Sequence, residues 1–393
     1  MLDVAVVGVG GWGKNLARTY YQIPECRLKY ICDLDEQKLE NLRLQLPGTT
    51  LTTRFDELLQ DTALKAVAIA TTAATHYSLC KAALQAGKDV FVEKPFVLGL
   101  AEAQELIQIA AQEDRILMVG HLLEYHPVMR RLKQMIEHKE LGDIYYIYTQ
   151  RVNLGVVRND ENALWNFSPH DISSILYLLG KEPSDVSARG QCYLQRDIED
   201  VVFLTLNFNG KSMAHIHVSW LDPHKIRRIT IVGSKKMAVF DDVETTEKLR
   251  VYDKSAEQNT SYSSFAEYVT LRFGDVTIPH LKIEEPLRLE CQHFLECVRQ
   301  RKQPLSDGRD GLRVLEVLEA AQQSLRNNGV PIPIERNLRP TKVADLVSHE
   351  SIAKNGVAIS KELRADSGVP HQDRRSQLDD LTGRLNYSTK KTC

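Results

Sequence analysis

The sequence has no excess of charge of either sign and no long apolar run. Its 393 residues include 50 Lys and Arg against 52 Asp and Glu, a formal net charge of -2. This balance argues against a strongly basic nucleic-acid binder and provides no polybasic segment for a membrane surface. No apolar stretch reaches the roughly 20 residues of a membrane-spanning helix, and the N-terminus lacks the basic region and cleavage site of a secretory signal. We therefore expect a cytoplasmic protein that binds neither nucleic acid nor membrane.

Paired cysteine motifs are also missing. The seven cysteines are scattered along the chain and no two form a C-x-x-C pair. This pattern indicates neither a disulfide framework nor a zinc site, and it fits a reducing compartment. The pair His215 and His217 would point to one face of a strand, where solvated side chains are far commoner than metal ligands. No metal is therefore predicted.

At about 150 residues per domain, the length suggests two or three domains. Residues 1–121 alternate short apolar runs with helical patterns, which predicts a parallel sheet covered by helices on both faces. The expected strands are residues 4–7, 28–32, 66–70, 89–92 and 116–119, with helices at 77–86 and 99–113 among them.

The pattern changes in residues 122–339. After a helix at 126–139, strand-like segments follow one another without intervening helices at 144–152, 186–192, 201–208, 213–220, 228–232 and 237–241. This order predicts an α+β domain with a mostly antiparallel sheet, closed by helices at 287–301 and 308–327. Residues 340–393 contain a single aromatic residue, Tyr387, and are expected to form a flexible polar tail or an interaction arm.

A glycine-rich loop follows the first predicted strand. The segment Gly8-Val9-Gly10-Gly11-Trp12-Gly13 fits G-x-G-x-x-G and opens a helix, so it can bind a pyrophosphate at the helix N-terminus. Asp33 lies 20 residues beyond Gly13, at the end of the second apolar run, where a carboxylate can accept hydrogen bonds from ribose hydroxyls. Because an acid there repels a 2′-phosphate, NAD is favoured over NADP; Asp35 is the alternative for the same role.

Glu93-Lys94-Pro95 follows the strand at 89–92, at the sheet edge where ligands of open α/β sheets gather. A lysine in this place can bind a substrate hydroxyl, or act as a base if burial or nearby cations lower its pKa. A surface lysine in a turn shaped by Pro95 is the competing interpretation.

A histidine in the second domain is the other candidate for proton transfer. In Ser168-Pro169-His170-Asp171, either Ser168 or Asp171 could cap a helix over residues 171–179 that ends at Gly180. His170 would then sit at a helix N-terminus, whose dipole lowers its pKa and keeps the imidazole neutral. A histidine that only bonds to the backbone is the alternative.

The ordered series of motifs resembles the Gfo/Idh/MocA oxidoreductases over residues 1 to about 335. The resemblance rests on the glycine loop, Thr71-Thr72 with His76, Glu93-Lys94-Pro95, Gly120-His121 with Pro127, and Glu285-Pro286-Leu287 with Glu290 and Phe294. It implies a Rossmann domain, a second domain whose large open sheet builds homo-oligomers, and hydride transfer between a sugar-like alcohol and a nicotinamide. It implies that Lys94 and His170 face the reacting carbinol. The implied cofactor contacts come from Gly8, Gly10, Gly11, Trp12, Gly13, Asp33, Thr71, Thr72, His76, Glu93, Lys94 and Trp165.

A narrower resemblance concerns residues 150–173. The segment Gln150-Arg151-Val152-Asn153-Leu154-Gly155, then Glu161-Asn162, Leu164-Trp165 and Phe167 to Ser173, is similar to the UDP-N-acetylglucosaminuronate 3-dehydrogenase branch. This implies NAD-dependent oxidation of a C3 hydroxyl of a UDP-linked N-acetylamino sugar or its uronate, in polysaccharide biosynthesis, with the ketone passed to an aminotransferase. The implied substrate contacts are Lys94, Arg151, Asn153, Asn166 and His170. Many family members have an aspartate four residues before the histidine; here Asn166 stands there, which shifts weight to Lys94.

Several alternatives remain at this point. Arg151 could form an ion pair on a strand instead of holding a substrate carboxylate or phosphate, and Trp165 could belong to the core instead of packing on the nicotinamide. The enzyme could instead act on inositol or a free sugar, or the chain could be a nicotinamide-binding regulator without turnover. Residues 349–359 faintly resemble the start of a hexapeptide-repeat acyltransferase, as the remnant of a fusion would.

Overall fold

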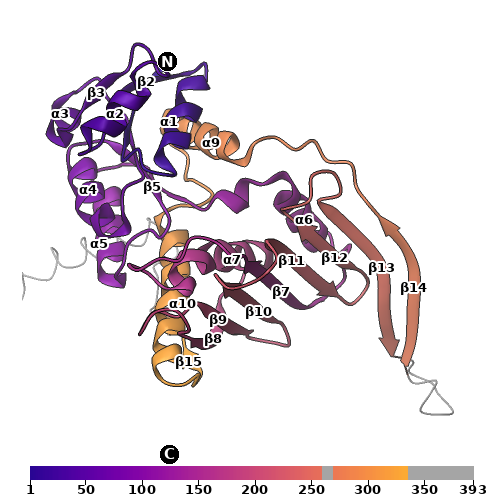
Figure 1. Cartoon of the computed structure of the whole chain (residues 1–393). Coiled ribbons are helices and arrows are strands. Elements are labelled where there is room, and N and C mark those ends of the chain that lie inside the picture. Colours follow the sequence, from indigo (N-terminus) through magenta and orange to yellow (C-terminus); the bar gives the residue numbers. More distant parts are fainter. Residues whose placement is uncertain (259–268, 335–393) are drawn as a thin grey trace, which may run out of the picture. The chain divides into compact units, whose positions relative to one another are not determined.

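The computed structural model describes residues 1–258 and 269–334 (Figure 1). The predicted tail at 340–393, with its segment 349–359, lies outside the described residues. No helix within the described ranges is both long and apolar enough to cross a membrane.

The first domain is a six-stranded parallel sheet with strand order β3-β2-β1-β4-β5-β6. Its elements are β1 (Leu2–Val7), α1 (Gly13–Gln22), β2 (Cys26–Cys32), α2 (Glu36–Arg43), β3 (Thr50–Thr52), α3 (Phe55–Gln60), β4 (Ala66–Ile69), α4 (Ala73–Gln85), β5 (Asp89–Glu93), α5 (Leu100–Gln112) and β6 (Leu117–Gly120). In this doubly wound order all strands are parallel, but successive strands are added on one side of β1 up to β3 and on the other side from β4 onward; ligands bind at the carboxyl ends of the strands where the order reverses, between β1 and β4. The predicted Rossmann sheet is confirmed, except that the three-residue β3 was not foreseen.

The second sheet has nine strands in the order β14-β13-β12-β11-β7-β10-β9-β8-β15. Its strands are β7 (Ile144–Val152), β8 (Pro183–Gln191), β9 (Val201–Phe208), β10 (Met213–Ser219), β11 (Ile226–Gly233), β12 (Met237–Asp241), β13 (Leu249–Gln258), β14 (Val269–Thr277) and β15 (Ile332–Pro333). The helices of this part are η1 (Leu122–Tyr125), α6 (Pro127–Glu137), α7 (Ala163–Leu179), α9 (Pro286–Gln300) and α10 (Gly308–Arg326). The pair β7–β10 is parallel and the other pairs are antiparallel, so the prediction of a mostly antiparallel sheet is confirmed.

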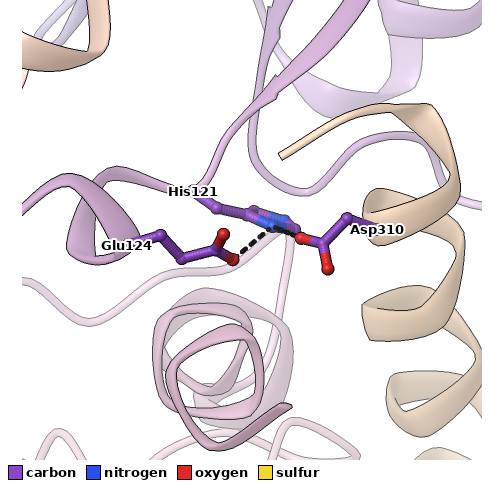
Figure 2. A group of neighbouring side chains, drawn as sticks. All are labelled: His121, Glu124 and Asp310. Carbon is purple, nitrogen blue, oxygen red and sulfur yellow. Dashed lines mark hydrogen bonds and ion pairs between the residues drawn. The ribbon is translucent and has the colours of Figure 1, made fainter. Parts of the chain in front are cut away.

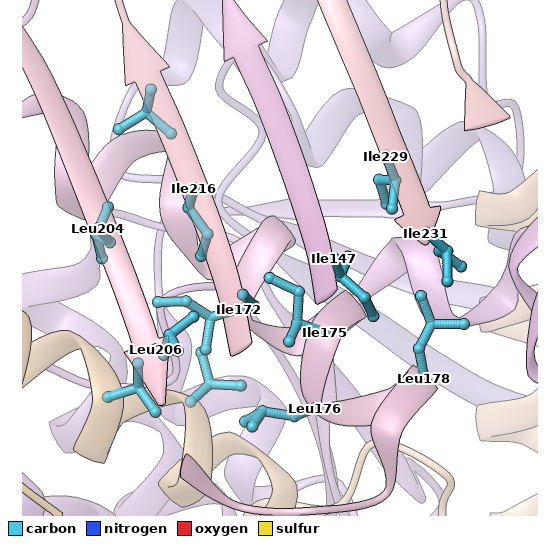
Figure 3. Packing of buried hydrophobic residues seen from close by; sticks show 14 of the residues in the cluster. Ile147, Ile172, Ile175, Leu176, Leu178, Leu204, Leu206, Ile216, Ile229 and Ile231 are labelled. Carbon is cyan, nitrogen blue, oxygen red and sulfur yellow. The ribbon is translucent and has the colours of Figure 1, made fainter. Parts of the chain in front are cut away.

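One face of this sheet packs on α7 and the other is open. Alternate residues of β9 and β10, such as Leu204, Leu206 and Ile216, are fully buried, and Figure 3 shows them on the side that carries the isoleucines and leucines of α7. The residues between them, Phe203 and His215 included, point to the opposite face. Strict alternation along the strands therefore builds an α+β domain whose large sheet is covered on one side.

The position of α9 differs from the prediction. The helix was expected to close the second sheet, yet Leu287, Cys291 and Phe294 belong to the buried cluster that holds Val4 and Leu16 of the first domain. The Phe294 ring lies 5.9 Å from that of Phe91 on β5, and Figure 1 shows α9 next to α1. The apolar stripe of α9 would fit either sheet, so the sequence predicts the helix but not its partner. The chain thus returns to complete the first domain.

Helix α10 contacts both domains. Leu312 and Leu315 pack in a cluster of the first domain, whereas Val314, Val317 and Leu318 pack in the core of the second. Residues on two sides of a single helix therefore fix the edge of β6 against α7, where the candidate site residues converge.

Candidate active site

The glycine loop is tightly packed at Gly8 and Gly13 and leaves open space over Gly10 and Gly11. Gly8 has φ +85°, and a Cβ on Gly13 would lie 1.9 Å from the carbonyl oxygen of Gly8, which no side chain could tolerate. Positions 10 and 11 differ, because a Cβ on Gly10 or Gly11 would meet nothing within 4 Å. The loop is thus held by contacts at Gly8 and Gly13, with room for a pyrophosphate over Gly10 and Gly11 at the start of α1. The residues present therefore fit a dinucleotide.

This geometry predicts opposite effects of two alanine substitutions. Gly13→Ala should lower the free energy of unfolding by about 1–3 kcal/mol, because the loop and β1 must shift to make room for the methyl group. Gly10→Ala should leave the melting temperature of the free protein unchanged but weaken NAD binding, because its methyl group fills the space above the loop. Thermal unfolding with and without NAD measures both effects. Equal melting temperatures of Gly13→Ala and the wild type would contradict the loop geometry.

Asp33 at the end of β2 faces the glycine loop. Its Oδ2 accepts a hydrogen bond from the backbone N–H of Val9 at 2.7 Å, and its Oδ1 accepts one from Asp35 at 3.0 Å. Asp35 itself caps α2 by accepting from the backbone N–H groups of Gln37 and Lys38. Asp35 therefore serves as the N-cap of α2, and Asp33 remains the better candidate for accepting hydrogen bonds from the ribose hydroxyls.

Trp12 connects the glycine loop to the end of β5. Its indole N–H donates to Glu93 Oε1 at 2.5 Å, and the Glu93 side chain is buried. Burial raises the pKa of Glu93 to about 7, although the Trp12 hydrogen bond and the charge of Lys94 act in the other direction. Glu93 therefore ties the cofactor loop to the segment that carries Lys94.

Lys94 joins the two domains at the carboxyl end of β5. The peptide bond between Lys94 and Pro95 is cis, and Lys94 Nζ donates to the backbone carbonyl of Asn166 on α7 at 3.0 Å. Burial chiefly lowers its pKa, with Arg151 and Arg158 acting in the same direction against Glu161 and Glu93. A lowered pKa increases the fraction of neutral amine, which a general base requires.

His170 lies within α7 and not at its start, so that prediction is wrong. The helix begins at Ala163, because the Asn162 side chain caps it by accepting from the backbone N–H of Trp165 at 3.1 Å. Pro169 lies inside the helix, where its missing N–H and its ring usually mark a start or a kink. The C-terminal end at Gly180, in the left-handed conformation, is as predicted.

The pKa of His170 is nevertheless well below its usual value. Burial is the main cause, followed by the positive charges of Lys94, Arg151 and Arg227. The imidazole is therefore neutral at pH 7, as expected, but for a reason other than a helix dipole. Lys94 is close enough to His170 for its charge to act on the imidazole.

Arg151 forms the ion pair that the sequence left open. Its Nε and Nη2 bond Asp171 Oδ2 and Oδ1 at 2.7 and 3.3 Å, and the two side chains are 9% and 1% exposed. A buried, two-contact pair fixes the orientation of both groups. The remaining guanidinium N–H groups are the part of Arg151 that a substrate could use.

The other proposed substrate residues have protein partners as well. The Asn166 side chain donates to Glu161 and accepts from Trp220 Nε1, the latter at 3.3 Å. Asn153 follows β7, half-buried, and its backbone N–H bonds the Ser219 carbonyl at 3.2 Å. These contacts orient the Asn166 amide at the edge of the Lys94 site, so both asparagines stay predictions as hydroxyl-binding groups.

Trp165 contacts the cores of both domains. Its indole N–H donates to Gln322 Oε1 at 3.0 Å, and its ring packs against buried clusters of the first and the second domain. This placement favours the core interpretation over stacking on a nicotinamide.

His76 ties two loops of the first domain together. It is buried on α4, its Nδ1 lies 2.9 Å from the Pro95 carbonyl oxygen, and its Nε2 lies 3.3 Å from that of Thr71. Thr72, the residue before α4, and Thr71 thus lie on a loop braced against Glu93-Lys94-Pro95. His76 positions these loops, whereas Thr71 and Thr72 remain candidates for cofactor contact.

His121, Glu124 and Asp310 form a buried ionic cluster that the sequence did not predict. His121 Nδ1 lies 2.8 Å from Asp310 Oδ2 and 3.4 Å from Glu124 Oε1 (Figure 2). Burial alone would lower the pKa of His121, but the two carboxylates raise it to about 10. One nitrogen of His121 and one carboxylate oxygen each of Glu124 and Asp310 lie within 4.8 Å of one another, as metal ligands would. The ion pair between protonated His121 and Asp310 also explains why these atoms are close together. The absence of a metal stays a prediction. Only the Gly120-His121 motif hinted at this cluster, because Asp310 is far away in the sequence.

Two family models match the chain. The oxidoreductase family with an NAD-binding Rossmann fold matches residues 2–121, and the C-terminal alpha/beta domain of the same family matches residues 133–334. Together they cover most of the chain, which shows the family and the NAD-binding role of the first domain.

Relatives with different substrates resemble the chain to similar degrees. A UDP-N-acetylglucosamine 3-dehydrogenase of Acidithiobacillus ferrooxidans is 26% identical over 315 residues, which are 80% of this chain and 94% of the relative. The scyllo-inositol 2-dehydrogenase (NAD(+)) of Bacillus subtilis is 27% identical over 347 residues, 84% and 96% of the two chains. A solved structure of the Acidithiobacillus enzyme, GnnA, superposes with a TM-score of 0.70 at 25% identity, covering 83% of this chain and 98% of that one. The chain therefore belongs to the Gfo/Idh/MocA oxidoreductase family and is an NAD-dependent dehydrogenase that acts on CH–OH groups.

Proposed function

We propose that this dehydrogenase oxidises the C3 hydroxyl of a UDP-linked N-acetylamino sugar, or of its uronate, to the 3-keto sugar. The observation that carries the proposal is the juxtaposition of Lys94 and His170, brought together when Lys94 Nζ donates to α7 at Asn166. Both groups have lowered pKa values, for which burial is the chief cause.

The chemistry requires the removal of one proton and one hydride from the carbinol. The glycine loop and Asp33 would hold NAD, which would supply the acceptor for the hydride from C3. Lys94 or His170 takes the hydroxyl proton, and the surrounding cations favour the negative charge that develops on the oxygen. Because Lys94 is also held by a main-chain carbonyl, its amine is oriented before the substrate arrives.

The assignment to a nucleotide sugar has two supports. The first is the 26% identity to a UDP-N-acetylglucosamine 3-dehydrogenase, and the second is the group of cations near His170, which includes Arg151 and Arg227. The inositol dehydrogenases of similar identity keep inositol as the alternative substrate. A regulator without turnover is disfavoured, because both proton acceptors of a dehydrogenase are present.

A panel of substrates tests the proposal. The purified protein is incubated with NAD⁺ and UDP-N-acetylglucosaminuronate, UDP-N-acetylglucosamine, UDP-glucose or free inositol, while NADH absorbance is followed and ketone products are sought by mass spectrometry. We expect NADH and a 3-keto product with an N-acetylamino sugar nucleotide. Turnover of inositol and of none of the UDP-sugars would contradict the proposal.

We also propose a homo-oligomer built through the open face of the second sheet. Tyr146 is 41% and Phe203 is 44% exposed on that face, and the Phe203 ring stacks on His217 at 4.3 Å. Exposed aromatic patches of this kind mark interaction surfaces. The mass in solution should therefore be that of a dimer or a tetramer, measured by light scattering; a monomer at micromolar concentration would contradict this proposal.

The remaining parts of the proposal concern the cellular setting. We propose that the enzyme works in the cytoplasm and in polysaccharide biosynthesis, where an aminotransferase would consume the ketone. The six cysteines of the described residues are free thiols, which suits a reducing compartment.

A further inference from the structure

Two arginines lie directly opposite each other on the α7 side of the second sheet. Arg227 on β11 pairs with Arg151 on β7 in the antiparallel register, so their Cβ atoms are close neighbours on one face. The side of the sheet is fixed by the residues that follow, because Ile229 and Ile231 are buried against α7 (Figure 3). Both arginines therefore approach the helix that carries His170.

The two arginines differ in what holds them. Arg151 is buried and bonds Asp171 through two nitrogen atoms. Arg227 is exposed, and within residues 1–258 and 269–334 no side chain forms a hydrogen bond or ion pair with its guanidinium. One cation of the pair is thus neutralised by the protein, and the other is available to a ligand.

The carboxylates near Arg227 already have other cationic partners, so no anion is left to pair with its guanidinium. Arg151, Asp171 and Asp242 are the charged groups that act on it, and Asp171 is already bonded to Arg151. Asp242 Oδ1 lies 3.8 Å from both Lys248 Nζ and His126 Nε2. Although Arg227 as a whole is exposed, partial burial of its guanidinium, followed by the charge of Arg151, lowers its pKa. A ligand carboxylate would relieve the repulsion between the two guanidinium groups.

We propose that Arg227 binds a carboxylate on the sugar ring of the substrate and thereby selects a uronate over the neutral amino sugar, an inference that rests on the proposed function. The planar guanidinium offers a fork of N–H donors that matches a carboxylate and has no equally good partner in a hydroxymethyl group. Its place beside His170 brings that carboxylate close to the carbinol. Arg151, fixed by Asp171, adds a second positive charge beside Arg227.

Matched variants of adjacent arginines test this inference. Arg228, the next residue, faces the opposite side of the sheet and pairs with Asp241 at 2.7 Å. We compare Arg227→Gln and Arg227→Lys with Arg228→Gln, using UDP-N-acetylglucosaminuronate and UDP-N-acetylglucosamine as probes. The measurements are kcat/KM for each probe and, by calorimetry, the Kd of each probe for the protein saturated with NADH.

The wild type should prefer the uronate. Arg227→Gln should lower its affinity and kcat/KM for the uronate by roughly 10–100-fold and change those for UDP-N-acetylglucosamine by less than about threefold, since a charge-assisted pair is lost only with the acid. Arg227→Lys should fall between, and Arg228→Gln should keep the wild-type preference. Equal losses with both probes, or no loss, would overturn the role of Arg227 and leave the proposed function standing. If the wild type neither binds nor oxidises any UDP-sugar, the proposed function itself fails and this inference falls with it.

Discussion

Replacing Lys94 by methionine should lower kcat by roughly 10²–10⁴-fold while NAD still binds, because a positioned proton acceptor contributes about that much to a reaction of this type. Methionine keeps most of the apolar stem and removes the amine that donates to the Asn166 carbonyl. The glycine loop and Asp33, which we expect to bind the dinucleotide, form no hydrogen bond with this amine in the described structure. Stopped-flow turnover and the Kd of NAD measure the two effects separately.

A second lysine serves as the control for this experiment. Lys81 on α4 pairs with Glu105 on the surface of the first domain, so Lys81→Met removes the same charge without touching the site. It should keep wild-type turnover. If Lys94→Met is as active as Lys81→Met, Lys94 has no role in proton transfer; if it also loses NAD binding and thermal stability, its role is to hold the two domains together.

Removing the imidazole of His170 should also lower kcat, by roughly 10²-fold or more, but without removing the rise of activity with pH. Burial, followed by the charges of Lys94 and Arg151, lowers the pKa of His170 well below its usual value, so its titration does not account for a rise of activity toward alkaline pH. The pKa of Lys94 is lowered too, so a rise of kcat/KM with increasing pH would report deprotonation of its ammonium. The sign follows because only the neutral amine accepts a proton.

The pH profiles of three proteins distinguish the two groups. Wild type and His170→Asn should share the rise of kcat/KM toward alkaline pH, and Lys94→Met should lack it. If His170→Asn loses the rise and Lys94→Met retains it, the base is the histidine and the assignment proposed for Lys94 is reversed.

The parallel sheet and the glycine loop could be predicted because their signals are local. The runs that became β1, β4 and β5 are continuous and apolar, as strands buried on both faces must be, and Gly8 to Gly13 have a spacing that only a tight turn needs. The site roles of Lys94 and His170 came from motif order and stay predictions; the structure links Lys94 to α7, the helix that carries His170.

The features that the sequence did not predict depend on contacts between residues that lie far apart in the chain. Ser168 and Asp171 suggested a helix start near residue 171, although Asn162 caps α7 about two turns earlier and Pro169 is accommodated inside the helix. β14 was missed although Val269, Leu271 and Phe273 alternate with polar residues; almost all of its residues are exposed, so this alternation does not mark a buried face. The pairing of Arg151 with Asp171, and of His121 with Asp310, cannot be inferred from spacing, because each partner lies on another element.

In the proposed reaction, a hydride leaves C3 of a UDP-linked amino sugar and passes to NAD. The most direct measurement uses UDP-N-acetylglucosaminuronate deuterated at C3, incubated with NAD⁺ and the wild-type protein, with mass spectrometry of the nucleotide and sugar products. We expect singly deuterated NADH in equal amount to a 3-keto sugar that has lost the label, and neither product with Lys94→Met. Unlabelled NADH, or a sugar product that keeps the deuterium at C3, would contradict it.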